Sequence, residues 1–334
     1  SRAGSVPLVT GVRVRMLALL AVLLVSGCTI PRYEPDVMPL KGCGPVGYAD
    51  LRGHRPPYGA SQLAPFANDH AMCAGRWVPG ANDWLVPQGM TIAGGTAYVA
   101  SFDGTKVGGQ RLCTMQSMDL RTGALIKARY PVIGRVGPRQ PTECRHGGGV
   151  VADEHGVWLA ETQRLWRLDP TTLKPKRGWA LAEPVRGSFA VFDGDGRLGL
   201  GRFRAENPAR LWWFDVDALL ASSSYELDEG DAVDAVRIPP DTQGALWAEL
   251  GGVGPGLWLA RSNTSCGVLV GPDGKDRAFV PGAEGMALTG PDHLWVVSES
   301  GSRLYQEKGR PMTPHLARFD TTGIRQWLEP TCSP

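Results

Sequence analysis

Short apolar runs separated by tight turns recur along the chain from about residue 87 onward. The clearest copy lies in residues 283–299, where a run ending at Leu288 is followed by Gly290-Pro291-Asp292-His293 and a second run over 294–297. Apolar runs bounded by Gly, Pro, Asp and His are typical of strands joined by a turn. This segment therefore predicts a strand, a tight turn and a second strand.

The same opening occurs five times, each time as a polar residue immediately before a glycine and an apolar strand. The five polar residues are Gln88, His146, Arg186, Gln243 and Glu284. A second apolar run follows each opening, and several third runs end in an aspartate turn, as at Asp119, Asp169 and Asp320. Aspartate caps such turns and glycine supplies their positive φ, so the pattern predicts repeated hairpins.

The glycines of successive openings are about 40 to 60 residues apart, a spacing typical of propellers and repeat arrays. One four-stranded sheet cannot bury both faces by itself, whereas sheets stacked around an axis bury each face against the next. The sequence therefore predicts an all-β propeller of four-stranded antiparallel blades over residues 43–334. Five repeats are visible, and residues 40–80 or Ile324–Trp327 would supply strands of a sixth blade. We expect six blades.

The N-terminal segment has the pattern of a secretory signal. Arg13 and Arg15 precede an apolar run from Met16 to Val25, which ends in Ser26-Gly27-Cys28. The run is about ten residues long, and a helix needs roughly 20 to cross a bilayer, so a signal peptide over residues 1–27 is predicted. Residues 1–15 are expected to precede the natural start at Met16.

Residues 25–28 resemble the bacterial lipobox, which implies that Cys28 carries a diacylglyceryl group and an acyl chain such as palmitate. An ordinary signal followed by an incidental cysteine is the alternative. Acyl chains on one cysteine would hold the protein on a membrane. Residues 28–42 would then be a lipidated tether, with the propeller on the extracytoplasmic side of the cell envelope. Thr29 resembles lipoproteins sorted to the outer membrane, if the host is Gram-negative.

Six cysteines remain after Cys28, and an even number in an exported chain predicts disulfides. Free buried thiols are the alternative. Sequence proximity and ring closure favour the pairs Cys43 with Cys73, Cys113 with Cys144, and Cys266 with Cys332.

The charge balance favours no polyanionic partner. The formal net charge is +2, and without the three arginines that precede Cys28 it is about −1. Runs or stripes of lysine and arginine are missing from the sequence, so nucleic acid is not expected as a partner.

The polar-Gly opening and the following Leu-Tyr/Trp-Val-Ala/Ser strand resemble the six-bladed propellers of the NHL, SMP-30/gluconolactonase and strictosidine-synthase-like group, over about residues 85–325. Lactonases of that group hold a divalent metal, usually calcium, on the axis through a glutamate with asparagines and aspartates. Glu284 matches that glutamate. Gln88, His146, Arg186 and Gln243 stand where the resemblance would place further Asn or Asp ligands.

Several candidate residues have two interpretations. Glu284 is either a metal ligand or acid/base group, or a solvated carboxylate that lines the channel and pairs with Arg186. His146 is a general base or a hydrogen-bonded pore histidine. Tryptophans at strand positions are core residues, or a sugar-stacking platform at Trp212 or Trp213, whose adjacency points one of them outward. Asp193-Gly194-Asp195-Gly196 is a hairpin turn or a fragment of a calcium loop.

The enzyme signatures G-x-S-x-G, H-E-x-x-H and the phosphate loop do not occur in the sequence, and no catalytic residue is predicted. The leading hypothesis is a propeller without a cofactor whose axial mouth, formed by the five polar opening residues, binds an envelope protein, a glycan or a small ligand. A metal-dependent lactonase or esterase-like hydrolase and an envelope assembly scaffold are the alternatives.

Overall fold

The apolar runs of the sequence form antiparallel sheets in the computed structural model, which describes residues 43–44, 46–81, 83–106 and 111–334. The predicted signal peptide, the lipidation site Cys28 and the tether of residues 28–42 lie outside the described residues. Among the helices of the described part, none has the length and apolarity needed to cross a membrane.

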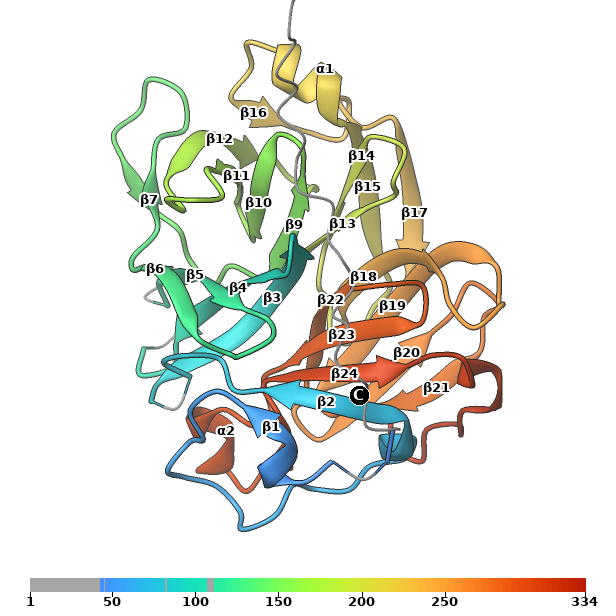
Figure 1. The fold of residues 1–334 in the computed structure, drawn as a ribbon. Coiled ribbons are helices and arrows are strands. Elements are labelled where there is room, and N and C mark those ends of the chain that lie inside the picture. The colour runs from blue at the N-terminus through green and yellow to red at the C-terminus, as the bar shows by residue number, and fades with distance from the viewer. Residues whose placement is uncertain (1–42, 45, 82, 107–110) are drawn as a thin grey trace, which may run out of the picture. The chain divides into compact units, whose positions relative to one another are not determined.

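The first two blades are four-stranded antiparallel sheets built from consecutive strands (Figure 1). Their strands are β3 (Leu85–Ala93), β4 (Thr96–Asp103), β5 (Cys113–Asp119) and β6 (Leu125–Arg129), then β9 (Gly149–Asp153), β10 (Gly156–Glu161), β11 (Arg164–Leu168) and β12 (Pro175–Leu181). A small hairpin of β7 (Ile133–Gly134) and β8 (Thr142–Glu143) separates the two blades in the chain.

The third and fourth blades repeat the pattern. Their strands are β13 (Phe189–Phe192), β14 (Arg197–Gly201), β15 (Ala209–Asp215) and β17 (Asp234–Ile238), then β18 (Thr242–Glu249), β19 (Pro255–Asn263), β20 (Cys266–Val270) and β21 (Asp276–Phe279). The connection from β15 to β17 carries α1 (Val216–Ala221) and β16 (Glu226–Leu227), and β16 adds to the second blade beside β12 in parallel. The third blade therefore also supports the edge of the second.

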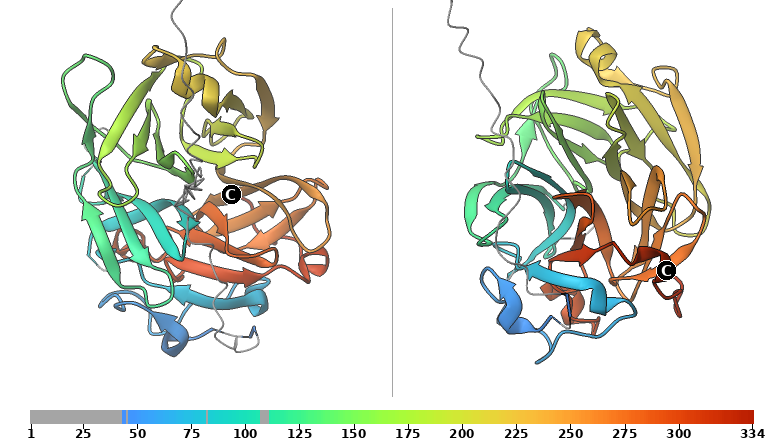
Figure 2. Two further views of the ribbon diagram at one scale, coloured as in Figure 1. Left: turned by 45° about the horizontal axis from the view of Figure 1, so that its top comes forward. Right: turned by 45° about the vertical axis from the view of Figure 1, so that its right-hand side comes forward.

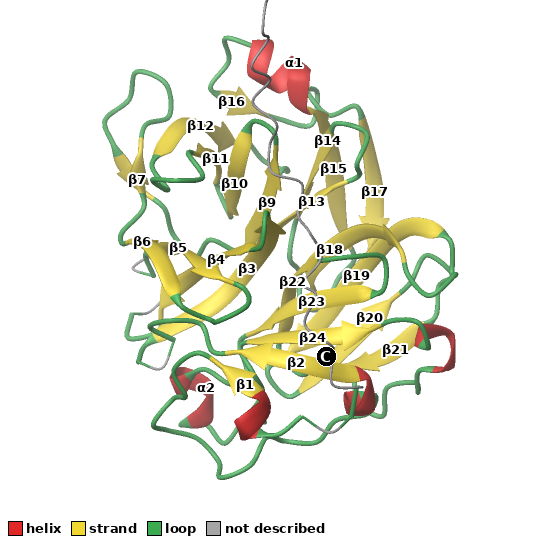
Figure 3. Cartoon of the chain, in the orientation of Figure 1, coloured by secondary structure: helices red, strands yellow, loops and turns green. Residues whose placement is uncertain are grey.

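The fifth blade joins the two ends of the described chain. It contains β22 (Ala283–Leu288), β23 (His293–Ser298) and β24 (Leu316–Asp320), and its outer strand is β2 (Met72–Arg76) from the N-terminal side. The short β1 (Leu51–Arg52) lies parallel to β2. Short helices lie outside the sheets, as Figure 3 shows: among the described residues they include α2 (Arg303–Gln306) and 3₁₀ turns at Tyr48–Asp50, Asp69–Ala71 and Ile324–Gln326.

The inner strands of the five blades contact one another in a closed cycle, β3 to β9, β13, β18, β22 and back to β3 (Figure 2). The prediction of an all-β propeller with four-stranded antiparallel blades is therefore confirmed. The expected sixth blade is absent from the described residues. Strand β2 completes the fifth blade instead of starting a sixth, and Ile324–Gln326 is a 3₁₀ turn.

Four of the five opening glycines lie close to the neighbouring inner strand, whereas Gly187 lies against the carbonyl oxygen of Glu161 in β10. A Cβ at Gly244 would lie 2.0 Å from the carbonyl oxygen of Glu284, and one at Gly148 would lie 2.1 Å from that of Ser188. Gly89 and Gly285 meet the backbone of the next inner strand in the same way. The recurrent polar-Gly pair thus has a steric cause, because only a residue without a side chain fits between adjacent blades near the axis.

Five hydrophobic clusters fill the spaces between successive blades, so both faces of every blade are covered. Trp212 packs toward the second blade and Trp213 toward the fourth, and both are buried. The hypothesis that one of this pair faces solvent as a sugar platform is therefore wrong. Alternation along a strand points side chains to opposite faces, but in a propeller blade each face is core.

All three predicted disulfides are present, Cys43–Cys73, Cys113–Cys144 and Cys266–Cys332. The last bond ties the C-terminal segment to strand β20 of the fourth blade. Three disulfides indicate a protein of an oxidising, extracytoplasmic compartment.

Candidate functional site

Three of the five polar opening residues lie at irregularities of the inner strands. The pairing between inner and second strand shifts register at Gln88 in β3, at Gln243 in β18 and at Glu284 in β22. A β-bulge leaves a residue out of the ladder and changes the direction of its side chain. In these three blades the shift lies at the end where the second strand finishes, and we call this end of the propeller the axial mouth.

Gln88 and Glu284 belong to a buried polar cluster with Glu299 and Tyr305. The Nε2 of Gln88 donates a hydrogen bond of 2.6 Å to Oε2 of Glu299, which follows β23. The hydroxyl of Tyr305 in α2 hydrogen-bonds to the same carboxyl group. Glu284 is 2% exposed and its Oε1 has no hydrogen-bond partner among the described residues. Two carboxyl groups therefore share one water-poor environment.

Burial sets the protonation of this cluster. Loss of solvation raises the pKa of Glu299 to about 7, against the lowering effect of its hydrogen bonds to Gln88 and Tyr305. Burial, and then the nearby charge of Glu299, raise the pKa of Glu284 well above its ordinary value. The neutral form of Glu284 is therefore favoured, and Glu299 changes its charge near neutral pH.

His146 lies on the same side of the molecule but in a different environment. It adopts φ of +63° just before β9, and its ring stacks on Phe102 at 4.7 Å between centroids. The guanidinium of Arg111 lies over the same phenyl ring, 4.5 Å from its centroid. Burial, and then the charge of Arg111, lower the pKa of His146 to about 4. The imidazole is thus neutral, and a general base of such low pKa is weak at neutral pH.

A cavity of about 400 Å³ opens beside His146, between the first and second blades. Its lining includes Arg111, Arg145, Glu161, Gln163 and Arg164. The carboxyl group of Glu161 already has partners within the protein, because it accepts hydrogen bonds from Arg164 at 2.6 Å and from the Trp166 indole at 3.3 Å. Arg111 and Arg145 leave this cavity with positive charge available to a ligand.

Arg186 and Gln243 do not join the buried cluster. The guanidinium of Arg186 donates to the carbonyl oxygens of Leu181 and Val185 and forms an ion pair with Glu183. The interpretation of Glu284 as a solvated carboxylate paired with Arg186 is therefore wrong, because Glu284 is buried and Arg186 forms its ion pair with Glu183, three residues away. Gln243 donates to the carbonyl and hydroxyl oxygens of Ser262 at 3.2 Å.

The residues around Glu284 do not fit a calcium site. Calcium takes about six to eight oxygen ligands, usually with several carboxylates. In the part of the chain that the structure describes, no cluster of three acidic, histidine or cysteine ligands includes Glu284. Arg111 and Lys308 also add positive charge near Glu299.

Sequence reasoning missed Glu299, Tyr305 and Arg111. Glu299 had a detectable signal, because it follows a second strand that contains Trp295, much as Glu161 ends the strand of Trp158. Tyr305 and Arg111 lie in connections between strands, where no periodicity marks them.

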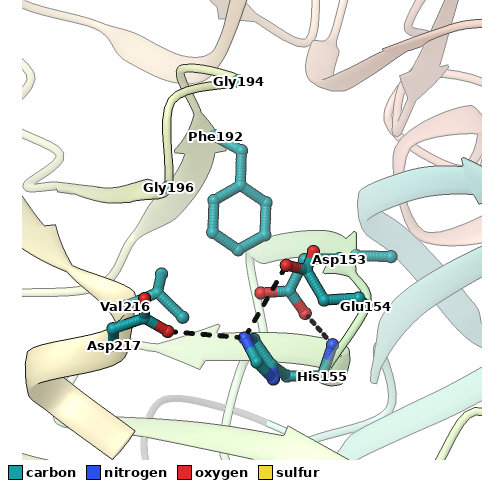
Figure 4. Close-up of a pocket in the computed structure, with 9 residues that line it drawn as sticks. Asp153, Glu154, His155, Phe192, Gly194, Gly196, Val216 and Asp217 are labelled. Atoms are coloured by element: carbon teal, nitrogen blue, oxygen red, sulfur yellow. Dashed lines mark hydrogen bonds and ion pairs between the residues drawn. The ribbon is translucent and has the colours of Figure 1, made fainter.

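A second cavity, of about 320 Å³, lies at the turns that join inner to second strands in the second and third blades (Figure 4). The carboxylate of Asp153 is held there by the Trp158 indole and by backbone amides of its own turn. Asp193 likewise accepts from the amides of Asp195 and Arg197, so Asp193–Gly196 is a hairpin turn. These acids stabilise turns.

No family model and no curated protein sequence matches the chain. Among solved structures it is similar to a PQQ-bound aldose sugar dehydrogenase from Streptomyces coelicolor, with 14% identity, 80% of this chain and 99% of that chain covered, and a TM-score of 0.38. The calcium-binding protein regucalcin from Agrobacterium tumefaciens has 15% identity, covers 77% of this chain and 93% of its own, and has a TM-score of 0.40. The Pan2 WD40 domain from Neurospora crassa has 12% identity, 73% and 65% coverage, and a TM-score of 0.38. Likeness at this level carries no argument about activity, and the propeller fold of this chain rests on its own five sheets.

Proposed function

We propose that this protein is a ligand-binding propeller of the bacterial cell envelope, anchored through a lipid on Cys28, with its binding site at the axial mouth. The cavity beside His146 is the observation that carries the proposal, because it combines charge, polar groups and a rigid frame. The ligand is a small hydroxylated molecule or glycan end that bears a carboxylate. The three disulfides support an extracytoplasmic location.

Charged and neutral residues of the lining would bind different groups of the ligand. Arg111 and Arg145 supply guanidinium groups, which bind a carboxylate through paired N–H donors. Thr162 and Gln163 supply neutral donors and acceptors for hydroxyl groups. Arg111 is held over the Phe102 ring, so part of the site is ordered before the ligand arrives.

Replacing Arg145 by alanine is expected to weaken carboxylate binding by about tenfold or more, because a charged hydrogen bond contributes over roughly 1.4 kcal/mol. Saturation-transfer NMR with glucuronate, and with neutral glucose as the comparison, would measure it. Arg145 is exposed, so the variant is expected to fold. Arg121→Ala removes an exposed arginine from a turn of the first blade and is the matched control. Equal signals from glucose and glucuronate, or no effect of Arg145→Ala, would contradict the proposal.

A metal-dependent lactonase or esterase-like hydrolase is the alternative, and it requires calcium at Glu284. We expect the melting temperature of the purified protein to be the same in calcium and in chelator, because no preformed cluster of ligands surrounds Glu284 in the described residues. Differential scanning fluorimetry would measure it. A calcium-dependent rise of several degrees that Glu284→Gln abolishes would replace our proposal with the hydrolase and direct assays to lactones.

A further inference from the structure

A row of arginines crosses the third blade at its axial-mouth end, outside the site proposed above. Arg202 follows β14, and its backbone amide donates to the carbonyl oxygen of Arg210 in β15 at 3.1 Å. Arg210 in turn stands directly opposite Arg237 of β17 in the register of the sheet. Arg202 thus lies just past the end of β14, and Arg210 and Arg237 lie on the next two strands of the same sheet.

The charges in this row are mostly not neutralised. Arg202 pairs with Glu183 at 2.7 Å. The guanidinium groups of Arg204, Arg210 and Arg237, by contrast, have no hydrogen bond or ion pair to any described residue. Like charges directly opposite each other on paired strands destabilise a sheet. A bound anion would turn this repulsion into attraction.

The same arginines line a cavity of about 520 Å³. Its lining includes all four arginines, Trp212 and one acid, Glu229. Trp212 is held by the core between the second and third blades, and Arg210 and Arg237 project from strands. Arg210 and Arg237 therefore project from a rigid sheet beside this cavity, while Arg202 and Arg204 reach it from the connection between β14 and β15.

We infer that this cavity binds a phosphate group. Arginine presents a planar fork of donors that matches phosphate oxygens in pairs, and several uncompensated guanidinium groups suit a dianion better than a single carboxylate. The phosphate belongs either to a small soluble molecule or to a lipid headgroup of the membrane that the anchor would place nearby. The inference shares no residue with the carboxylate site and does not depend on it.

Titration of the full chain with inorganic pyrophosphate tests the inference. Wild-type protein is expected to bind, and Arg210→Gln with Arg237→Gln is expected to weaken binding by about tenfold or more for each arginine replaced. Both side chains are exposed, so the double variant is expected to fold with an unchanged or higher melting temperature without ligand, because the repulsion is relieved. Arg52→Gln with Arg121→Gln removes two exposed charges elsewhere and should bind pyrophosphate as the wild type does.

Sedimentation with phosphatidylcholine vesicles, with and without phosphatidylglycerol, separates the two sources of phosphate. Binding of pyrophosphate without retention on anionic vesicles assigns the cavity to soluble phosphates. Retention that pyrophosphate reverses and the double variant abolishes assigns it to headgroups. Failure of pyrophosphate to bind, or equal binding by the double variant, would overturn the inference.

Discussion

Gly244→Ala is expected to destabilise the propeller by about 3 kcal/mol. The added Cβ would lie 2.0 Å from the carbonyl oxygen of Glu284, and this neighbour is backbone of an inner strand, so it cannot move aside as a flexible side chain would. Relief requires the fourth and fifth blades to separate, which opens the hydrophobic cluster between them. Equilibrium unfolding in urea would measure the loss.

Two further alanine variants make this measurement decisive. Gly148→Ala places its Cβ 2.1 Å from a carbonyl oxygen of the third blade and should be destabilised to a similar extent. Gly323 has φ of −92°, and a methyl group added to it would have no atom beyond its two chain neighbours within 4 Å, so Gly323→Ala should change stability by less than about 0.5 kcal/mol. If Gly244→Ala behaved like Gly323→Ala, the inner strands would not approach as closely as the five-bladed ring requires.

Glu299→Gln is expected to change how stability depends on pH. The carboxyl of Glu299 has its pKa raised from 4.5 to about 7 in the folded protein, mainly by burial. A raised pKa means that the folded state holds the proton more tightly than the unfolded state. The contribution of Glu299 to the free energy of unfolding is therefore greatest below pH 4.5, and it is lost as the pH rises from 4.5 to about 7. The free energy of unfolding of wild type minus variant should fall by about 3 kcal/mol over that window.

The difference between the two proteins is the informative quantity, because two histidines act in the opposite direction. Burial lowers the pKa of both His146 and His315 to about 4, so their contributions to the free energy of unfolding are lost as the pH falls below 6.5. They are the same in both proteins and cancel in the difference. Glu284 changes the difference in the same direction, because the charge of Glu299 helps to raise the pKa of Glu284 in the wild type. Urea unfolding at several pH values would measure the difference, and exposed Glu307→Gln is the control. A difference that did not change between pH 4.5 and 7 would show that Glu299 is not buried as described.

The strands and turns of the propeller could be predicted because their signals are local. The apolar runs over 157–161 and 294–297 form the second strands β10 and β23. The side chains of Asp169 and Asp320 cap the turns that follow the third strands β11 and β24. The number of blades could not be counted in the same way. Strand β2 joins the fifth blade across the full length of the domain, and no local pattern specifies the partner of an edge strand.

The polar opening residues and the three disulfide pairs were also visible in the sequence, the first as a repeated pattern and the second as neighbouring cysteines. Only the tertiary structure decided which polar groups meet. Gln88 lies 211 positions from its partner Glu299, while Arg186 pairs with Glu183 three positions away. The sequence by itself thus determined the repeated strands, turns and glycines, because each depends on neighbours along the chain. Ring closure determined the buried carboxyl pair and its protonation, because burial and charge depend on residues that only the closed ring brings together.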